Sequence, residues 1–192
     1  MGDSNPLEIL QNSLLGAPII WKGDYPYFIH PISDGIPRME AEVLRATRDL
    51  IVESVDWDKI DLVVSVEAMG LPLLAAVGEA SGKPTVVIRK RTYGMKGEVK
   101  VNVSTGYSES TVYINDISSG ERILIVDDVI STGGTLEPIL QALEEMGVIL
   151  QDIVIAIEKG EGKKRLALER PKWPIRTLAK IEIIDGKVGI IE

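Results

Sequence analysis

The chain has 192 residues, 45% of them hydrophobic and 26% charged, which is typical of a globular domain with a sizeable core. Its formal net charge of −8 argues against a nucleic-acid binder that relies on a basic face, and no apolar run approaches the ~20 residues of a membrane span. The absence of cysteine excludes disulfides and thiolate metal sites, and no basic, apolar leader opens the sequence. We therefore expect a cytoplasmic protein with neither a membrane nor a nucleic-acid partner.

Residues 1–37 combine one helical pattern with short extended pieces. Leucines at helical spacing follow the start signal Asn5-Pro6 and predict a short helix. Residues 18–21 and 25–29 predict two short strands, joined by a Lys-Gly-Asp turn. Three prolines between residues 26 and 37 argue against further regular structure in this segment.

From residue 40 onward, apolar strands and helices alternate. Strands are predicted at 61–66, 85–88, 122–126 and 152–157, and helices at 40–55, at 70–80 and from 136 onward. This order predicts an α/β fold with a doubly wound, mainly parallel sheet and right-handed crossovers. Because ligands bind at the carboxyl edge of such sheets, the loops that follow the four strands are expected to form one site.

Two further segments predict β-hairpins. Residues 92–115 contain glycine and then alternate apolar and polar residues, which predicts an arm that closes over the site as a mobile flap. Residues 175–191 alternate around Asp185-Gly186, a favoured hairpin turn. With no repeat or linker in sight, the whole chain, 1–192, is expected to form one domain.

The most informative stretch is R-I-L-I-V-D-D-V-I-S-T-G-G-T-L, residues 122–136. A buried strand is followed by two adjacent carboxylates, Asp127 and Asp128, and then by a loop of small residues before a helix. Such a loop offers backbone N–H groups and a positive helix end, which suits a phosphate, although the spacing of a nucleoside-triphosphate loop is missing. Carboxylates beside a phosphate need a metal or sugar hydroxyls between them. Phosphoribosyl pyrophosphate (PRPP) combines all these groups.

The run V-D-D-V-I-S-T-G-G-T resembles the PRPP signature of the type I phosphoribosyltransferases. The runs R-K-R-T-Y-G-M-K-G-E-V, S-T-G-Y-S and I-E-K-G-E-G-K-K resemble the archaeal-type hypoxanthine/guanine enzymes, a group similar to adenine phosphoribosyltransferases. The resemblance covers about residues 18–191. It implies the type I fold with a hood formed by residues 1–37, a flap formed by residues 92–115, and a homodimer. The implied reaction is Mg²⁺-dependent transfer of 5-phosphoribosyl from PRPP to a purine.

The resemblance also assigns roles to residues at the ends of the predicted strands. Asp127 and Asp128 would be catalytic, hold the ribose hydroxyls and contribute to a Mg²⁺ held mainly by PRPP. The 5-phosphate would bind to Ser131, Thr132, Gly133, Gly134 and Thr135. Pyrophosphate would bind to Glu67, Ala68, Met69, Gly70, Arg89 and Lys90. Met69 stands where adenine-type enzymes carry arginine, so one charged contact to pyrophosphate is missing. The cations at 89–91 could alternatively be a run of solvated surface residues.

The choice of base depends on four candidate residues. Lys159 stands where six-oxopurine enzymes place a donor to O6, with a solvated loop lysine in a charged run as the alternative interpretation. Its neighbour Glu158 would instead accept from an amino group. His30, the only histidine, lies near the expected purine contact of the hood, with a structural role as the alternative. Tyr107 matches the flap tyrosine of adenine-type enzymes, but Gly106 replaces the acidic residue that precedes it there.

We therefore expect a purine salvage enzyme for hypoxanthine and guanine, with adenine as the alternative base. A non-catalytic PRPP-sensing regulator is a further alternative. It is disfavoured because residues 1–35 are too short and proline-rich for a DNA-binding domain and because the net charge is −8.

Overall fold

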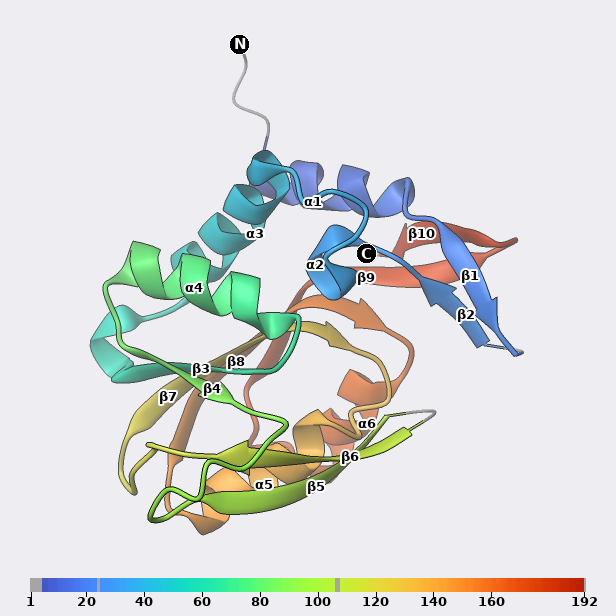
Figure 1. Ribbon diagram of the computed structural model, residues 1–192. Helices are drawn as coiled ribbons and strands as arrows, with labels where there is room; N and C mark the ends of the chain where they lie inside the picture. Colours follow the sequence, from blue (N-terminus) through green and yellow to red (C-terminus); the bar gives the residue numbers. More distant parts are fainter. Residues whose placement is uncertain (1–4, 24, 106–107, 192) are drawn as a thin grey trace.

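The computed structural model describes residues 5–23, 25–105 and 108–191, and Figure 1 shows their arrangement around one central sheet. The sheet has six strands in the order β10-β9-β8-β7-β3-β4, of which only the edge strand β10 is antiparallel to its neighbour. The strands are β3 (Leu62–Val66), β4 (Thr85–Ile88), β7 (Arg122–Ile130), β8 (Ile149–Lys159), β9 (Ile175–Ile184) and β10 (Lys187–Ile191). This confirms the predicted α/β fold with a doubly wound, mainly parallel sheet.

The two faces of the sheet are covered by different elements (Figure 1). Apolar side chains of α1 (Pro6–Leu15), α3 (Ala41–Ser54) and α4 (Gly70–Ser81) pack on one face. The other face is covered by α5 (Leu136–Glu145), α6 (Gly162–Glu169) and the hairpin of β5 (Val99–Thr105) and β6 (Ser108–Ile114). Burial of both faces explains the nearly continuous apolar sequence of the central strands. None of the helices within the described residues is long and apolar enough to span a membrane.

The N-terminal segment is more regular than its prolines suggest. β1 (Ile19–Lys22) and β2 (Tyr25–Phe28) form an antiparallel hairpin, which we call the hood hairpin. A one-turn helix, α2 (Pro31–Asp34), follows it, and a 3₁₀ turn, η1 (Trp57–Lys59), follows α3. The prediction of no regular structure after residue 29 was therefore wrong, because a proline at the first helical position loses no hydrogen bond and fits the helix geometry.

Strands β7 and β8 extend beyond the rest of the sheet. Pairing of β7 with β3 ends at Ile125, whereas its pairing with β8 continues to Ile130. The prediction that the strand ends before Asp127 was therefore wrong, because the ladder with β8 continues through both acidic residues. One edge of β7 is left open at this position, and the site lies there.

The predicted hairpin arm is present, but its body is firmly packed. Val101 and Val103 of β5 and Val112 of β6 are buried in the apolar cluster that includes α5. At its distal end, the backbone N–H of Ser104 donates to the carbonyl of Gly134, at 3.1 Å. Motion of the whole arm would expose this apolar face to water, which disfavours it.

Candidate active site

A cavity of about 390 Å³ lies between the hood hairpin and the extended ends of β7 and β8. Residues 127–136 form one wall, with Ile155 and Lys159 of β8 beside them. The opposite wall consists of Lys22, Tyr25, Tyr27, Phe28 and Ser33. The structure thus brings Lys159 into the same cavity as the acidic pair and the small-residue loop, although Lys159 is distant from both in the sequence.

The loop of residues 131–135 turns tightly between β7 and α5. Gly133 has a φ of 82°, a left-handed conformation that favours glycine. A Cβ on Gly134 would lie 2.4 Å from the carbonyl oxygen of Ser104, so only glycine lets the hairpin approach this closely. The first turn of α5 follows at Leu136 and turns its positive end toward the loop. The loop therefore provides the backbone geometry of an anion site.

The acidic pair, Asp127 and Asp128, lies half-buried on the cavity wall. The Asp128 N–H donates to Asp127 Oδ1 at 3.1 Å. Burial raises the pKa of Asp127 to about 6, and burial and the neighbouring Asp127 charge raise the pKa of Asp128 well above its usual value. Two neighbouring carboxylates with raised pKa values are suited to a ligand that supplies positive charge or hydroxyl donors.

The loop of residues 67–70 approaches the acidic pair from β3. A Cβ on Gly70 would lie 2.7 Å from Asp127 Oδ1 and 1.9 Å from Ser65 Oγ, which excludes any larger residue without a local shift. The Glu67 carboxylate turns away from the cavity and accepts from Arg89 Nε at 2.5 Å and from the Lys90 N–H at 3.1 Å. Residues 67–70 therefore do not line the 390 Å³ cavity but lie beyond the acidic pair.

The remaining predicted pyrophosphate residues differ in the contacts that their side chains make. Arg89 is engaged by Glu67, whereas the Lys90 side chain is exposed. The Met69 side chain packs against the segment after α2, with its Cε 3.5 Å from the position of a Cβ on Gly35. The position that carries arginine in adenine-type enzymes thus connects this loop to the N-terminal segment by an apolar contact.

Lys159 is not a solvated loop residue, because it is the last residue of β8 and only 9% exposed. Its Nζ donates to the carbonyl of Pro26 at 2.5 Å and lies 3.9 Å from the centre of the Tyr25 ring. The Tyr25 hydroxyl is in turn 3.2 Å from Ser131 Oγ. An ammonium has three N–H donors, so Lys159 retains donors for a ligand in the cavity after binding Pro26.

One predicted base-site residue, Glu158, lies elsewhere. Glu158 faces the opposite side of β8, where it accepts from Thr177 Oγ1 at 2.8 Å and pairs with Lys163 Nζ at 3.1 Å. Its carboxylate does not line the cavity, because neighbours on a strand point to opposite faces. Tyr107 lies outside the described residues.

His30 also takes a structural position. It is 1% exposed and caps α2, with Nδ1 accepting from the Ile32 N–H at 3.2 Å and Nε2 lying 3.0 Å from Ser13 Oγ. Burial lowers its pKa to about 4, although the nearby Asp34 opposes this shift. Both ring nitrogens have protein partners and the ring lies outside the cavity wall, which favours the structural alternative for His30.

The sequence reasoning missed the hood side chains that form the second wall. Tyr25, Tyr27 and Phe28 lie within four residues, whereas aromatic residues make up only 5% of the chain. That local density was the available signal, because aromatic side chains are common in pockets that bind flat rings.

Comparison with known proteins gives consistent results. The family model described as "Phosphoribosyl transferase domain" matches residues 34–175. A hypoxanthine/guanine phosphoribosyltransferase of Methanotorris igneus is 46% identical over 183 residues, covering 95% of this chain and 100% of the relative. A hypoxanthine/guanine phosphoribosyltransferase of Methanohalophilus mahii is 47% identical over 186 residues, covering 97% of this chain and 96% of the relative.

Solved structures share the fold at lower identity. An adenine phosphoribosyltransferase from Thermoanaerobacter pseudethanolicus has a TM-score of 0.73 at 22% identity, covering 91% of this chain and 99% of its own. The enzyme from Trypanosoma brucei, in complex with AMP, pyrophosphate and ribose-5-phosphate, has a TM-score of 0.74 at 20% identity, covering 94% and 81%. Together with the full-length match to relatives near 46% identity, this fold places the chain in the phosphoribosyltransferase family.

Proposed function

We propose that this protein is a purine salvage glycosyltransferase, which transfers 5-phosphoribosyl from PRPP to hypoxanthine or guanine and yields IMP or GMP with pyrophosphate. The proposal rests on one observation above all: the buried ammonium of Lys159 shares a cavity with the acidic pair and the 131–135 loop. Relatives at 46% and 47% identity that carry the hypoxanthine/guanine name support the same reaction.

The residues of the cavity, together with residues 67–70 and Lys90 outside it, suit the parts of PRPP in order. The backbone N–H groups and hydroxyls of residues 131–135 would bind the 5-phosphate, and Asp127 and Asp128 would accept from the ribose hydroxyls. As the bond from C1 of the ribose to pyrophosphate breaks, positive charge develops on the sugar, which the two carboxylates stabilise. The amides of residues 67–70 and the exposed Lys90 would stabilise the departing pyrophosphate, while a ring nitrogen of the base bonds to C1 and loses its proton.

The same carboxylates fit Mg²⁺, a hard cation that prefers oxygen ligands and is commonly bound by one or two carboxylates together with substrate phosphates. Among the described residues no group of three or more His, Cys, Asp or Glu side chains could hold a metal alone. Asp127 and Asp128 would therefore share Mg²⁺ with oxygens of PRPP, and the ion would neutralise charge on the pyrophosphate.

Selection of a 6-oxopurine would follow from the donors of Lys159. Its ammonium is held by Pro26 and Tyr25 and presents N–H groups to the cavity, where an O6 acceptor of hypoxanthine or guanine could receive one. Adenine remains the second candidate because the Pro26 carbonyl is itself an acceptor that would suit an exocyclic amine. The two candidates differ in whether Lys159 or Pro26 contacts the base.

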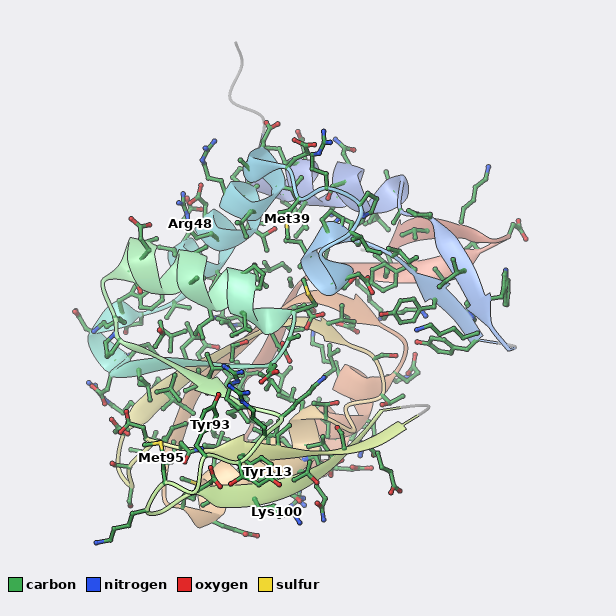
Figure 2. All side chains as sticks on the ribbon, in the orientation of Figure 1. Met39, Arg48, Tyr93, Met95, Lys100 and Tyr113 are labelled. Carbon is green, nitrogen blue, oxygen red and sulfur yellow. The ribbon has the colours of Figure 1, made fainter. Side chains whose placement is uncertain are left out.

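We also propose a cytoplasmic homodimer. Tyr93 and Met95, 49% and 53% exposed, lie in the segment before β5, and Figure 2 shows them at the same end of the molecule as Tyr113 of β6. Large apolar side chains of this kind favour contact with a second copy.

A base panel tests the proposal. The protein is incubated with PRPP and Mg²⁺ and separately with hypoxanthine, guanine, xanthine, adenine, uracil or orotate, and pyrophosphate release is followed. Hypoxanthine and guanine should give the highest kcat/KM, and the variant with both Asp127→Asn and Asp128→Asn serves as the inactive control. Pyrophosphate release with adenine or orotate alone would overturn the base assignment. If none of the six bases led to pyrophosphate release, the proposed function would be overturned.

A further inference from the structure

Four consecutive carbonyl groups of the 131–135 loop are bonded to donors outside the cavity. The oxygens of residues 131, 132, 133 and 134 accept, in that order, from Gly162 N at 2.8 Å, Arg165 Nη2 at 3.3 Å, Glu137 N at 2.9 Å and Ser104 N at 3.1 Å. These peptides are trans, so each carbonyl points away from the N–H of the next residue. Anchoring the carbonyls outward therefore turns the N–H groups of residues 132–135 to the opposite side, where the Gly134 N–H donates to Thr132 Oγ1 at 3.3 Å.

Only one of these four donors is a side chain. Arg165 projects from α6 and uses Nη2 for two partners, the Thr132 carbonyl and Glu137 Oε2 at 2.7 Å, while its Nη1 donates to Glu169 Oε2 at 2.5 Å. The same Nη2 lies 3.3 Å from the position of a Cβ on Gly133. The guanidinium thus lies directly behind the residue with a left-handed backbone, and its planar fork fixes several acceptors at once.

We propose that Arg165 is a positioning residue for the 5-phosphate of PRPP, an inference that rests on the function proposed above. By holding the Thr132 carbonyl outward, it keeps the Gly133 N–H aimed at the phosphate. It also neutralises Glu137, which lies in the first turn of α5, where an unpaired carboxylate would repel a phosphate dianion.

Other contacts fix α6 independently of this side chain. Leu166 is fully buried and packs behind Gly133, and the Gly162 N–H donates to the Ser131 carbonyl at 2.8 Å. Arg165→Met should therefore leave the fold and the end of β8 in place. The effect is expected on the phosphate and not on the base.

The experiment compares Arg165→Met with Lys164→Met. The side chain of the neighbouring residue, Lys164, is 73% exposed and pairs with Glu161 on the helix surface. Its replacement therefore removes the same charge without removing the contact to Thr132. Calorimetry with ribose 5-phosphate, which carries the 5-phosphate but no pyrophosphate, isolates the contact in question. Arg165→Met should weaken this binding and raise the KM for PRPP by about tenfold, the scale of a hydrogen bond from a charged group.

The same variant should keep the KM for hypoxanthine and kcat within about twofold, and Lys164→Met should match the wild type. Arg165→Lys keeps the charge but not the planar guanidinium, so its affinity for ribose 5-phosphate should be intermediate. This variant provides a second test if Arg165→Met folds poorly. In the double variant that combines Arg165→Met with Glu137→Gln, the affinity for ribose 5-phosphate should stay low, because the Thr132 carbonyl still lacks its donor. Full recovery of this affinity would contradict the positioning role.

Two results separate this inference from the function on which it rests. Unchanged ribose 5-phosphate affinity in Arg165→Met, with normal turnover, would overturn the role of Arg165 alone. A wild-type protein that binds ribose 5-phosphate but never releases pyrophosphate from PRPP would overturn the proposed function alone.

Discussion

Replacing Asp127 with asparagine should make the ligand-free protein more stable while it removes most activity. Burial raises the pKa of Asp127 from 3.8 to about 6, so the folded state binds this proton more tightly than the unfolded state. The stability that the group contributes is therefore present at low pH and is lost as pH rises from about 4 to about 6. At neutral pH this lowers the free energy of unfolding by at most about 3 kcal/mol. The value is an upper limit because both carboxylates keep some contact with water.

Asparagine has the same shape and its side-chain oxygen can still accept from the Asp128 N–H. Thermal unfolding of the ligand-free variant near pH 7.5 should show a midpoint raised by roughly 4–10 °C, and the gain should vanish near pH 4. Turnover should fall on the order of 10²-fold. A midpoint that is unchanged or lower near pH 7.5, or a gain that does not depend on pH, would refute the reasoning that burial of the acidic pair costs stability.

Three further predictions follow from other parts of the structure. The single histidine, His30, has a pKa lowered to about 4, so its neutral form contributes stability that is complete above about pH 6.5 and is lost as pH falls toward 4; its NMR resonance should titrate near pH 4, and an ordinary midpoint near 6.5 would contradict its burial. Gly133→Val places a β-branched residue at a φ of 82° and against Leu166, so PRPP affinity should fall by at least about tenfold in calorimetry, and unchanged affinity would count against the loop as the phosphate site. Light scattering should give twice the 21.0 kDa of one chain, and a fully active monomer would exclude the proposed homodimer.

The sequence predicts those features that depend on local pattern. Alternating apolar runs predict the strands and helices, and the run from Ser131 to Thr135 predicts a loop at a helix N-terminus, because small residues before an amphipathic pattern have few other uses. The turn at Asp185-Gly186 is also local, and both residues have the positive φ that a type I′ turn requires.

The features that the sequence does not predict depend on tertiary contacts. Asp127 and Asp128 lie inside a strand because the partner strand β8 continues beyond β3, and no local signal marks the length of a neighbour. Glu158 and Lys159 are equivalent as charged neighbours in sequence, but the strand places one on each face. His30 is assigned to a cap only by the position of Ser13 and Ile32 around it.

The central claim is that Lys159 selects a 6-oxopurine at a PRPP site, and a competition assay tests it directly. Hypoxanthine and adenine at equal concentration compete for a limiting amount of PRPP, and chromatography measures the ratio of IMP to AMP for the wild type and for Lys159→Gln. The wild type should form IMP almost alone, and the variant should lose hypoxanthine use by roughly 10 to 100-fold without a parallel loss of adenine use. AMP as the main wild-type product, or an unchanged ratio in the variant, would contradict the claim.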